Sequence, residues 1–529
     1  MAQYKTPGVY VVEKSAFPNS VVEVATAVPA FIGYTEFADN KGTSLANKPW
    51  RITSMAEFIA YFGGAPKTRF SIAGLAAPAA SEAGGAPAAN VGSADFSFFD
   101  AATKKRQQYV LSTEGTPYIL YYSMLLFFQN GGGPCYIVSV GNYGDDLDAD
   151  KITAGIDTLL KEQEPTMVLV PDAVHLKAQD CASVQSALLM HCGYKTRNRF
   201  ALLDVYDGYK DRQDPAGDCI SAFRESVGSN FLDFGAAYYP WINTSIVKDK
   251  DLDFTSIANP DVLTALIKQE LSSILDAKDP TPAAKVKIDQ INATLAAITT
   301  TQDQSNESAF DIHTVNKTLM AVSSLYPQII LAIQKKLNLL PPAAGMAGVY
   351  TMVDNTRGVW KAPANVSISG VVSPAVSISN DEQEDLNVHT QGKSVNAIRS
   401  FIGEGVMVWG ARTLDGNSLD WRYVSVRRTM LMIEESIKQA CKAYVFEPNT
   451  ANTWVTVKSM VRNFLTSVWK RGGLAGASAD DAFSVFVGLG ETMTADDILE
   501  GLLKVSVLVA VSRPAEFIEI TFEQQMQKS

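Results

Sequence analysis

Three consecutive glycines, Gly131-Gly132-Gly133, precede Pro134. Of all the motifs in the sequence, this one most suggests a chemical function, namely phosphate binding. A glycine-rich loop binds phosphate when it leads from a strand into a helix, because the free N–H groups of the helix N-terminus then face the anion. Here the order is reversed: an apolar helical pattern over residues 118–130 comes before the glycines, and a β-prone run over 135–140 follows them. The glycines are therefore interpreted as a left-handed helix C-cap, and no phosphate site is predicted.

Histidines and cysteines that could bind a metal gather between positions 175 and 192: His175, Cys181, His191 and Cys192. Structural zinc sites use pairs of ligands at short spacing, and the sequence contains no Cys-x-x-Cys pair. His191 and Cys192 come at the end of an amphipathic helical pattern, where core packing or surface exposure is the ordinary expectation. We therefore predict no metal ligands and no cofactor.

Acidic residues cluster at Asp145, Asp146, Asp148 and Asp150. They do not meet the calcium-loop pattern, and a predicted helix follows, so they are interpreted as a solvated loop with acid near a helix N-terminus. The sequence has no Gly-x-Ser-x-Gly motif and only 4 histidines in 529 residues, which leaves few groups for catalysis. We predict that the protein is not an enzyme.

Composition narrows the class further. A chain of 529 residues is too long for one ordinary core, so two to four domains are expected. The formal net charge of -11 argues against generic nucleic-acid binding. The N-terminus has no signal-peptide pattern, and the apolar run at 502–511 is shorter than the ~20 residues that span a bilayer. The expected product is made in the bacterial cytoplasm, has reduced cysteines and does not insert into a membrane.

Strand and helix patterns alternate through the first half of the chain. A strand is predicted over 22–34, and a helix with a capping-box spacing begins at Ser54 and ends before Gly63. The alternation that follows predicts an α/β layer with a largely parallel sheet. It consists of strands over 135–140, 167–170, 200–205 and 236–241, with helices over 150–161, 177–191 and 217–226.

Two segments interrupt this pattern. Residues 65–97 are rich in Ala, Gly, Pro and Ser, and we expect them to form a surface loop outside the core. Residues 249–345 carry helical patterning without glycine until position 345 and are expected to be a helical insertion. The remaining C-terminal section, 346–512, mixes strands with helices, the clearest of which runs from 425 to about 443.

Each end of the chain carries a β-prone run without a nearby hairpin partner, and such a run must pair with something distant. The N-terminal run is 9–12 and the C-terminal run is 517–522, in which Ile518, Ile520 and Phe522 alternate with Glu519 and Thr521. The candidate strand-forming residues are Val9, Tyr10, Val11, Val12, Ile518, Ile520 and Phe522.

Several motifs, in order along most of the chain, resemble the contractile tail sheath family of phages and phage-tail-like extracellular injection systems. Pro7-Gly8-Val9-Tyr10-Val11 stands near the start, and Trp409-Gly410-Ala411-Arg412 and Trp421-Arg422-Tyr423 lie in the densest, C-terminal part. Further matching segments are 26–33, 47–49, 53–58, 62–64, 127–132, 354–363, 398–400, 408–414, 421–428 and 434–436. Residues 65–97 and 251–340 show no such resemblance.

The resemblance implies a structural subunit that polymerises as stacked hexameric rings around an inner tube and contracts to drive that tube through a target envelope. The implied partners are further copies, paralogous sheath subunits, the inner tube, baseplate and cap proteins, within a phage tail or a released phage-tail-like particle. An α/β enzyme with a helical insertion, or a baseplate or tube-terminating component of the same machine, remains an alternative.

The expected fold class is α/β and α+β, multidomain and tail-sheath-like, with a discontinuous core, terminal strand-exchange arms and outer insertions. The resemblance places the helical insertion on the outer surface and the C-terminal domain against the inner tube. The predicted division is an N-terminal arm strand (1–20), an α/β domain (21–64 and 98–248), an Ala/Gly-rich insertion (65–97), a helical insertion (249–345), a C-terminal core domain (346–512) and a C-terminal arm strand (513–529).

Two surfaces follow as hypotheses. The terminal strands are expected to add to sheets of neighbouring copies, the alternative being that they pair within their own subunit. Residues 454–473 contain four cations and no acid, so this helix is expected to contact acidic groups of the inner tube, the alternative being an ordinary solvated face. The four cations are Lys458, Arg462, Lys470 and Arg471.

Overall fold

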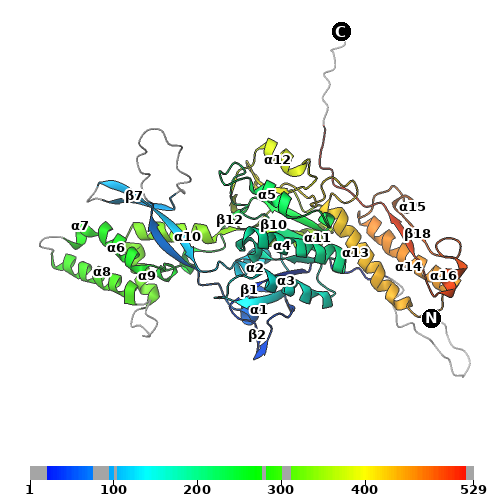
Figure 1. The fold of residues 1–529 in the computed structure, drawn as a ribbon, viewed down its shortest axis with the longest axis horizontal. Coiled ribbons are helices and arrows are strands. Elements are labelled where there is room, and N and C mark those ends of the chain that lie inside the picture. Colours follow the sequence, from blue (N-terminus) through cyan, green and yellow to red (C-terminus); the bar gives the residue numbers. More distant parts are fainter. Residues whose placement is uncertain (1–20, 76–93, 101–103, 277–280, 301–310, 520–529) are drawn as a thin grey trace, which may run out of the picture. The chain divides into compact units, whose positions relative to one another are not determined.

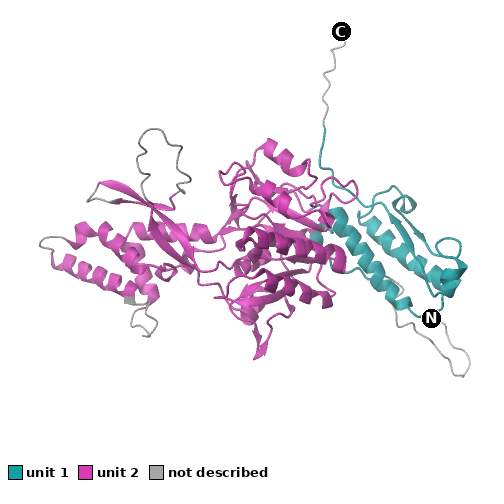
Figure 2. Ribbon diagram, viewed as in Figure 1, with its two compact units in different colours: residues 1–26, 354–362, 425–529 teal, residues 27–353, 363–424 magenta. Residues whose placement is uncertain are grey.

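The computed structural model describes residues 21–75, 94–100, 104–276, 281–300 and 311–519 of the chain (Figure 1). The chain divides into two compact units, which Figure 2 colours separately. Unit 1 combines residues 1–26, 354–362 and 425–529, and unit 2 combines 27–353 and 363–424. The predicted boundary at residue 346 therefore differs from the observed division, because most of the segment up to 424 belongs to unit 2.

A nine-stranded sheet forms the centre of unit 2, in the order β14-β17-β16-β11-β10-β9-β1-β8-β4. The six strands from β16 to β8 pair in parallel, whereas β4, β17 and β14 pair antiparallel with their neighbours. β16 joins β11, and this pairing explains why residues 363–424 belong to unit 2. The strands are β1 (Pro29–Thr35), β4 (Trp50–Ile52), β8 (Cys135–Asn142), β9 (Met167–Leu169), β10 (Phe200–Asp204), β11 (Gly235–Tyr239), β14 (Val366–Ser367), β16 (Asn396–Phe401) and β17 (Gly405–Val408).

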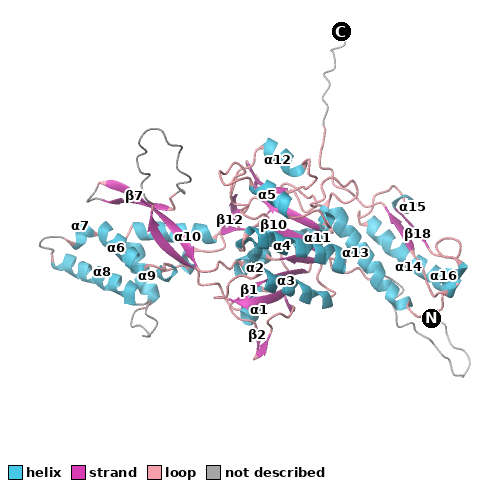
Figure 3. Cartoon of the chain, in the orientation of Figure 1, coloured by secondary structure: helices cyan, strands magenta, loops and turns pink. Residues whose placement is uncertain are grey.

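The central strands are buried along their whole length, as β1, β9, β10 and β11 each show. Strands covered on both faces need apolar side chains at successive positions, which explains their continuous apolar sequences. The predicted alternation of strands and helices between residues 135 and 241 is confirmed. The intervening helices are α3 (Ala149–Thr158), α4 (Ala178–Met190) and α5 (Cys219–Ser226) (Figure 3).

The first five parallel strands in chain order, β1, β8, β9, β10 and β11, have the spatial order second-first-third-fourth-fifth. The chain therefore moves from β1 to β8 in one direction and across β9, β10 and β11 in the other. Because crossovers between parallel strands are right-handed, helices of the two halves fall on opposite faces of the sheet. α3 packs against α4 and α4 against α5. α2 (Leu120–Gln129) packs against α11 (Ala343–Arg357), where Gly345 lies against Leu126.

Gly131 ends α2 in a left-handed conformation, with φ of 89°. Its N–H donates to the carbonyl of Phe128, and the N–H of Gly132 donates to that of Phe127. This pair of bonds is the Schellman arrangement of a helix C-terminus. The interpretation of the glycines as a C-cap is thus confirmed, since their N–H groups are used by the helix that precedes them.

The expectation that residues 65–97 lie outside the core is wrong at both ends of that segment. β5 (Arg69–Gly74), β6 (Phe96–Asp100) and β7 (Lys105–Glu114) form an antiparallel sheet in the order β5-β7-β6. Phe70 and Phe96 are buried in a cluster with residues of the helical insertion. These strands flank a low-complexity stretch whose composition dominated the prediction, and residues 76–93 lie outside the described residues.

The predicted helical insertion does consist mainly of helices. They share an apolar core in which Ile267, Leu295 and Ile330 are buried. A small three-stranded sheet in the order β13-β12-β15 accompanies these helices. The helix α11 begins at Ala343, so the predicted C-terminal limit of the insertion, residue 345, falls inside a helix. The elements are α6 (Pro260–Glu270), α7 (Ser272–Leu275), α8 (Pro282–Thr300), α9 (Ile312–Val322), α10 (Leu325–Leu337), β12 (Ile242–Thr244), β13 (Leu339–Leu340) and β15 (Val371–Pro374).

Shorter elements complete unit 2. α1 (Met55–Phe62) is capped by Ser54, whose side chain accepts from the N–H of Glu57, as the capping-box spacing predicts. β2 (Asp39–Asn40) pairs with β3 (Thr43–Ser44), and α12 (Asn380–Asn387) begins at a capping box made by Ser379 and Glu382.

Unit 1 packs two long helices against a sheet of two strands. α13 (Val424–Cys441) corresponds to the helix predicted over 425–443, and α14 (Ala451–Lys470) covers most of the cationic segment. β18 (Phe483–Phe486) pairs antiparallel with β19 (Ser506–Val509). The core of the unit includes Val461, Leu465 and Phe483. The short helices α15 (Ala479–Ala482) and α16 (Ala495–Leu499) belong to the same unit.

The chain ends differ in part from expectation. The strand predicted over 22–34 begins only at Pro29. Residues 21–26 belong to unit 1 instead, where the N–H of Val24 donates to the hydroxyl of Ser436, 3.1 Å away. The predicted N-terminal arm strand (1–20) lies outside the described residues. Of the C-terminal arm, residues 513–519 are described and contain no strand.

Replacing Gly131 by alanine should lower the stability of the full chain by about 1–2 kcal/mol, the cost of left-handed backbone for an L-residue. An added Cβ would also lie 2.9 Å from the Cβ of Met352. Gly133→Ala is the matched control, because nothing lies within 4 Å of the position that its Cβ would take and its φ is not positive. Urea unfolding should separate the two variants; equal stability would contradict the C-cap assignment.

Candidate assembly surfaces

The groups with potential for metal or acid–base chemistry lie within unit 2, where His191, Cys181 and Cys192 are buried and His175 is partly buried. Burial lowers the pKa of His175 and of His191 to about 4, so both imidazoles are neutral at physiological pH. Burial also raises the pKa of Cys181 and of Cys192 to about 12, which keeps both as unreactive thiols. His175 packs edge-on against the ring of Trp241. These residues have the surroundings of core side chains.

The acidic cluster forms a loop and a helix cap. Asp148 is the N-cap of α3, and its carboxylate accepts from the N–H groups of Asp150 and Lys151. The prediction of acid at a helix N-terminus is therefore confirmed. Across the described part of the chain, no three His, Cys, Asp or Glu side chains gather as metal ligands. None of the described helices combines the length and apolar character needed to cross a bilayer.

The sheet of unit 1 is the feature that suggests assembly. Among the described residues, β18 and β19 pair with each other in a sheet that has no third strand. A sheet of two strands is marginally stable alone, and its edges offer unpaired N–H and C=O groups. One face is covered, because Phe483 and Val485 are buried in the core beneath α14. The edges are left for a further strand.

The other face of this sheet is uncovered and carries exposed apolar side chains. Leu508, on β19, has 63% of its surface exposed, and Phe486, on β18, has 38%. Register places Leu508 opposite Ser484 and Phe486 opposite Ser506, so these side chains share the outer face. An exposed apolar face next to open strand edges is typical of a surface that another polypeptide covers.

The cations of α14 lie on its solvent side and are paired with acids of unit 1. Lys458 pairs with Glu491 at 3.1 Å. Arg462 pairs with Asp480 at 2.6 Å, and both side chains are more than half exposed. Solvent-exposed ion pairs of this kind contribute little to stability, so their cations can exchange partners at a small cost in free energy.

The remaining two cations flank the end of α14. Arg471 pairs with Glu23 and lies over the ring of Trp360, 5.2 Å from its centroid. Lys470, the last residue of the helix, is exposed. The buried face predicted for this helix is confirmed, since Val461, Leu465 and other apolar residues face the core.

A buried ion pair lies where three segments of unit 1 meet. Arg428, on α13, donates to both carboxylate oxygens of Asp354 at 2.9 and 2.6 Å, and also to the carbonyl of Thr26. The two side chains are only 4% and 2% exposed. Thr26, Asp354 and the start of α13 are each next to a position where the chain passes between the units. Arg428 thus fastens three connecting segments to one point of unit 1.

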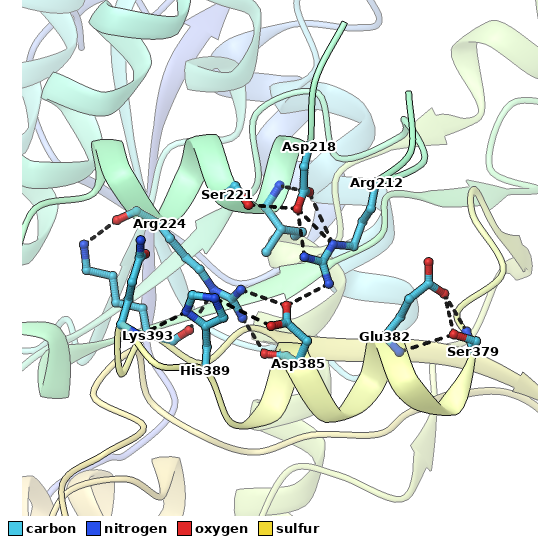
Figure 4. Close-up of polar contacts among 11 residues, drawn as sticks. Arg212, Asp218, Ser221, Arg224, Ser379, Glu382, Asp385, His389 and Lys393 are labelled. Atoms are coloured by element: carbon cyan, nitrogen blue, oxygen red, sulfur yellow. Dashed lines mark hydrogen bonds and ion pairs between the residues drawn. The ribbon is translucent and has the colours of Figure 1, made fainter. Parts of the chain in front are cut away.

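A second ion network lies within unit 2 and fastens α12 to α5 (Figure 4). The guanidinium of Arg224 is fully buried and donates to Asp385, 2.9 Å away, and to the carbonyl of Lys393. Arg212 bridges Asp385 and Asp218, at 2.8 Å from each. Charges therefore alternate along Asp218, Arg212, Asp385 and Arg224, which compensates the burial of the Arg224 charge.

The network also perturbs the ionisation of its members. Burial acts to raise the pKa of Asp385, but hydrogen bonds from Arg224 and Arg212 outweigh it and hold that pKa below its ordinary value. Burial, aided by the charge of Arg224, lowers the pKa of His389, whose ring lies 3.6 Å from Asp385. The carboxylate of Asp385 thus stays ionised, and Arg212 and Arg224 together balance its charge.

The C-terminal part of the chain matches a known family. The family model, described as the phage tail sheath C-terminal domain, matches residues 417–525, a span that contains α13, α14, β18 and β19. The tail sheath protein of Vibrio phage KVP40 is 26% identical over 138 residues, which cover 26% of this chain and 20% of that protein. A putative prophage major tail sheath protein of Pseudomonas aeruginosa (strain UCBPP-PA14) is 27% identical over 137 residues, covering 25% of this chain and 34% of that protein.

The match thus spans about a fifth to a third of these curated relatives' length. Solved structures extend the likeness to nearly the whole chain. The helical sheath of the anti-feeding prophage (AFP) in its contracted state has a TM-score of 0.59 at 26% identity, covering 99% of this chain and 100% of that one. The chain is thus similar, over nearly its whole length, to sheath proteins of contractile injection systems. The sheath of the extracellular contractile injection system PVC, at 24% identity and a TM-score of 0.56, has the same fold.

The predicted site residues have different outcomes. Val9, Tyr10, Val11 and Val12 lie outside the described residues, as do Ile520 and Phe522. Ile518 is described, is exposed and belongs to no strand. Lys458, Arg462, Lys470 and Arg471 are brought together on α14 and at its end. Strand exchange and tube contact remain predictions.

The sequence patterns did not predict either ion network. Asp354 and Arg428 lie 74 residues apart, and Arg224 and Asp385 lie 161 apart. Pairing over such distances follows from the fold and leaves no local spacing to recognise. For the first pair one signal existed, because both residues fall in segments that carry the family resemblance, 354–363 and 421–428.

Arg428→Ala should destabilise the full chain by about 3–5 kcal/mol, the usual cost of leaving a buried charge without its partner. Lys438→Ala on the same helix is the matched control, since its pair with Glu435 is solvent-exposed on the lysine side and should contribute about 0–1 kcal/mol. Denaturant unfolding of the full chain measures both. Similar small losses in the two variants would show that the pair does not anchor the unit.

Proposed function

We propose that this chain is the sheath subunit of a contractile injection machine, which polymerises as stacked hexameric rings around an inner tube and contracts to drive that tube through a target envelope. The observation that carries the proposal is the likeness, over nearly the full length of both chains, to the AFP sheath in its contracted state. The role is structural and needs no catalytic residue. We infer assembly in the bacterial cytoplasm, followed by function in a phage tail or a released particle.

The open sheet of unit 1 supplies the acceptor for the proposed strand exchange. Both ends of the chain belong to this unit, so both arms start from the body that carries β18 and β19. Val9–Val12 of one neighbour and Ile518, Ile520 and Phe522 of another would add strands at the two edges. Added strands pair the edge N–H and C=O groups, and they extend the apolar face that carries Leu508.

Strand donation of this kind links each copy to a different surface of the next one. Such head-to-tail contacts do not close on themselves along the axis and therefore produce a helical lattice. Contraction then draws on free energy stored when the extended lattice assembles, with the folded units moving as near-rigid bodies. The arms remain paired while the units move.

The cationic side of α14 is the proposed contact with the inner tube. Its ion pairs with Glu491 and Asp480 are exposed, so acidic groups of a tube can compete for Lys458 and Arg462 without a large penalty. A contact built from individually weak pairs also suits an attachment that must be released on firing. Baseplate and cap proteins would contact the ends of the cylinder, and paralogous subunits would enter the same lattice.

A second candidate is a subunit at the baseplate end of the same machine. A chain of the six-fold symmetrised AFP baseplate structure matches this one with a TM-score of 0.57 at 26% identity, covering 99% of this chain and 100% of that one. Electron microscopy of the purified chain separates the two. A sheath subunit should form hollow, striated cylinders, whereas a baseplate subunit should form discrete rings or remain unassembled.

Removal of either arm, residues 1–20 or 513–529, should leave a folded chain that cannot polymerise. The core of unit 1, in the part of the chain that the structure describes, contains no residue of either arm, so the unfolding transition should change little while cylinders disappear from micrographs. Co-expression of both truncated chains is the informative control, because each still lacks one donor strand and a continuous lattice should not return. Cylinders formed by either truncated chain would refute strand exchange.

Reversal of two cations, in Lys458→Glu with Arg462→Glu, should weaken association with the inner tube at least tenfold in a co-sedimentation assay. The matched control is Lys285→Glu with Lys287→Glu on α8, which makes the same change of net charge at exposed positions of the insertion. Both variants should still form sheath cylinders. Unchanged tube binding by the α14 variant would remove this contact from the proposal.

A further inference from the structure

The order of the parallel strands creates a defined place in unit 2 at which a ligand would be expected. The chain leaves β1 for β8 on one side and returns to β9 on the other, so the connections diverge between β1 and β9. In open α/β sheets this divergence leaves a crevice at the carboxyl ends of the two strands, and ligands with anionic groups bind there. The N-terminus of a helix usually supplies N–H groups to the anion.

In this chain a carboxylate of the protein occupies that place. Asp172 lies three residues after β9 and is fully buried. Its Oδ2 accepts from the N–H of Tyr34, 2.9 Å away near the end of β1, and its Oδ1 accepts from the N–H of Ile119, 2.8 Å away at the N-cap of α2. The N–H of Leu120, the first residue of α2, also hydrogen-bonds to the carboxylate.

The surrounding backbone is shaped to admit this carboxylate. The register of β1 against β8 shifts between Gly33 and Tyr34, at the residue whose N–H binds Asp172. A Cβ at Gly33 would lie 2.5 Å from Oδ2 of Asp172 and 3.1 Å from Leu120, so a larger residue would displace the carboxylate. Glycine is therefore required here by the close approach of the side chain.

This contact differs from the other aspartate caps of the chain. Asp148 and Asp218 each cap the helix that directly follows them in sequence, and both accept from an N–H two residues ahead. Asp172 instead reaches a helix 53 residues away and joins it to a strand of the sheet. Burial raises the pKa of Asp172 to about 6, although the backbone hydrogen bonds oppose this, so the group is ionised at pH 7.5.

We propose that Asp172 is an internal anion that fills the crevice between β1 and β9 and locks β1 to α2, in the place where this strand order takes the anionic group of a ligand. Unit 2 thereby holds one conformation without a bound ligand. The inference goes beyond the sheath role and would hold for any function of this chain. It assigns a positioning role to Asp172, with Gly33 providing the space.

Chemical rescue tests the proposal. Asp172→Ala removes the carboxylate and leaves the N–H groups of Tyr34, Ile119 and Leu120 facing a space large enough for formate. In the full chain at pH 7.5 the variant should unfold several degrees below the parent. Sodium formate should recover a substantial part of that loss, relative to the same concentration of sodium chloride, while the parent responds equally to both salts.

Two further variants keep the test decisive. Asp148→Ala also removes a helix-capping carboxylate, but one exposed to solvent, so formate should give it no specific recovery. Asp172→Asn keeps the shape of the side chain, but its amide NH2 group must face at least one of the backbone N–H donors, so that two donors oppose each other. This variant should therefore be less stable than the parent and unresponsive to formate. Equal responses of Asp172→Ala to formate and chloride would overturn the proposal. If Asp172→Ala does not fold, parent-like stability of Asp172→Asn would overturn it instead.

Discussion

Backbone N–H and C=O groups at the edge of a strand must find partners, and this requirement governs how the whole chain is organised. The central strands of unit 2 meet it internally, because each of them pairs with a neighbouring strand on both sides. In the described part of unit 1 this requirement is not met, because β18 and β19 pair only with each other as strands. The proposed polymer follows from this asymmetry, since the incomplete sheet belongs to the unit from which both chain ends start.

Rigidity is supplied by buried charge in both units. Arg428 and Asp354 hold the connecting segments of unit 1, and Arg224 with Asp385 holds α12 within unit 2. Compensated charges of this kind add little net stability, but removing one partner is costly. They therefore favour one arrangement of the elements over alternatives.

Sequence patterns predicted the part of the fold that has strong periodicity. The parallel strands of unit 2 are continuous apolar runs separated by amphipathic helices, and the glycines after α2 ended a helix as their order required. The predictions failed where composition masked pattern, as in β5 and β6 beside a low-complexity stretch. Contacts such as Arg224 with Asp385 depend on folding across 161 residues, and the sequence holds no local trace of them. The cations of α14 were identifiable, but their acidic partners within unit 1 were not.

Unit 1 is assembled from the two extremes of the chain, since residues 21–26 pack with α13, α14 and the strands that end at Val509. During synthesis, unit 2 can complete its sheet once residue 408 has left the ribosome, whereas β19 appears about a hundred residues later, on the order of 10 s at typical translation rates. The strand edges of unit 1 are therefore complete only after unit 2 has been synthesised. With the proposed strand exchange, nascent chains on one polysome would not join each other until each has a complete unit 2.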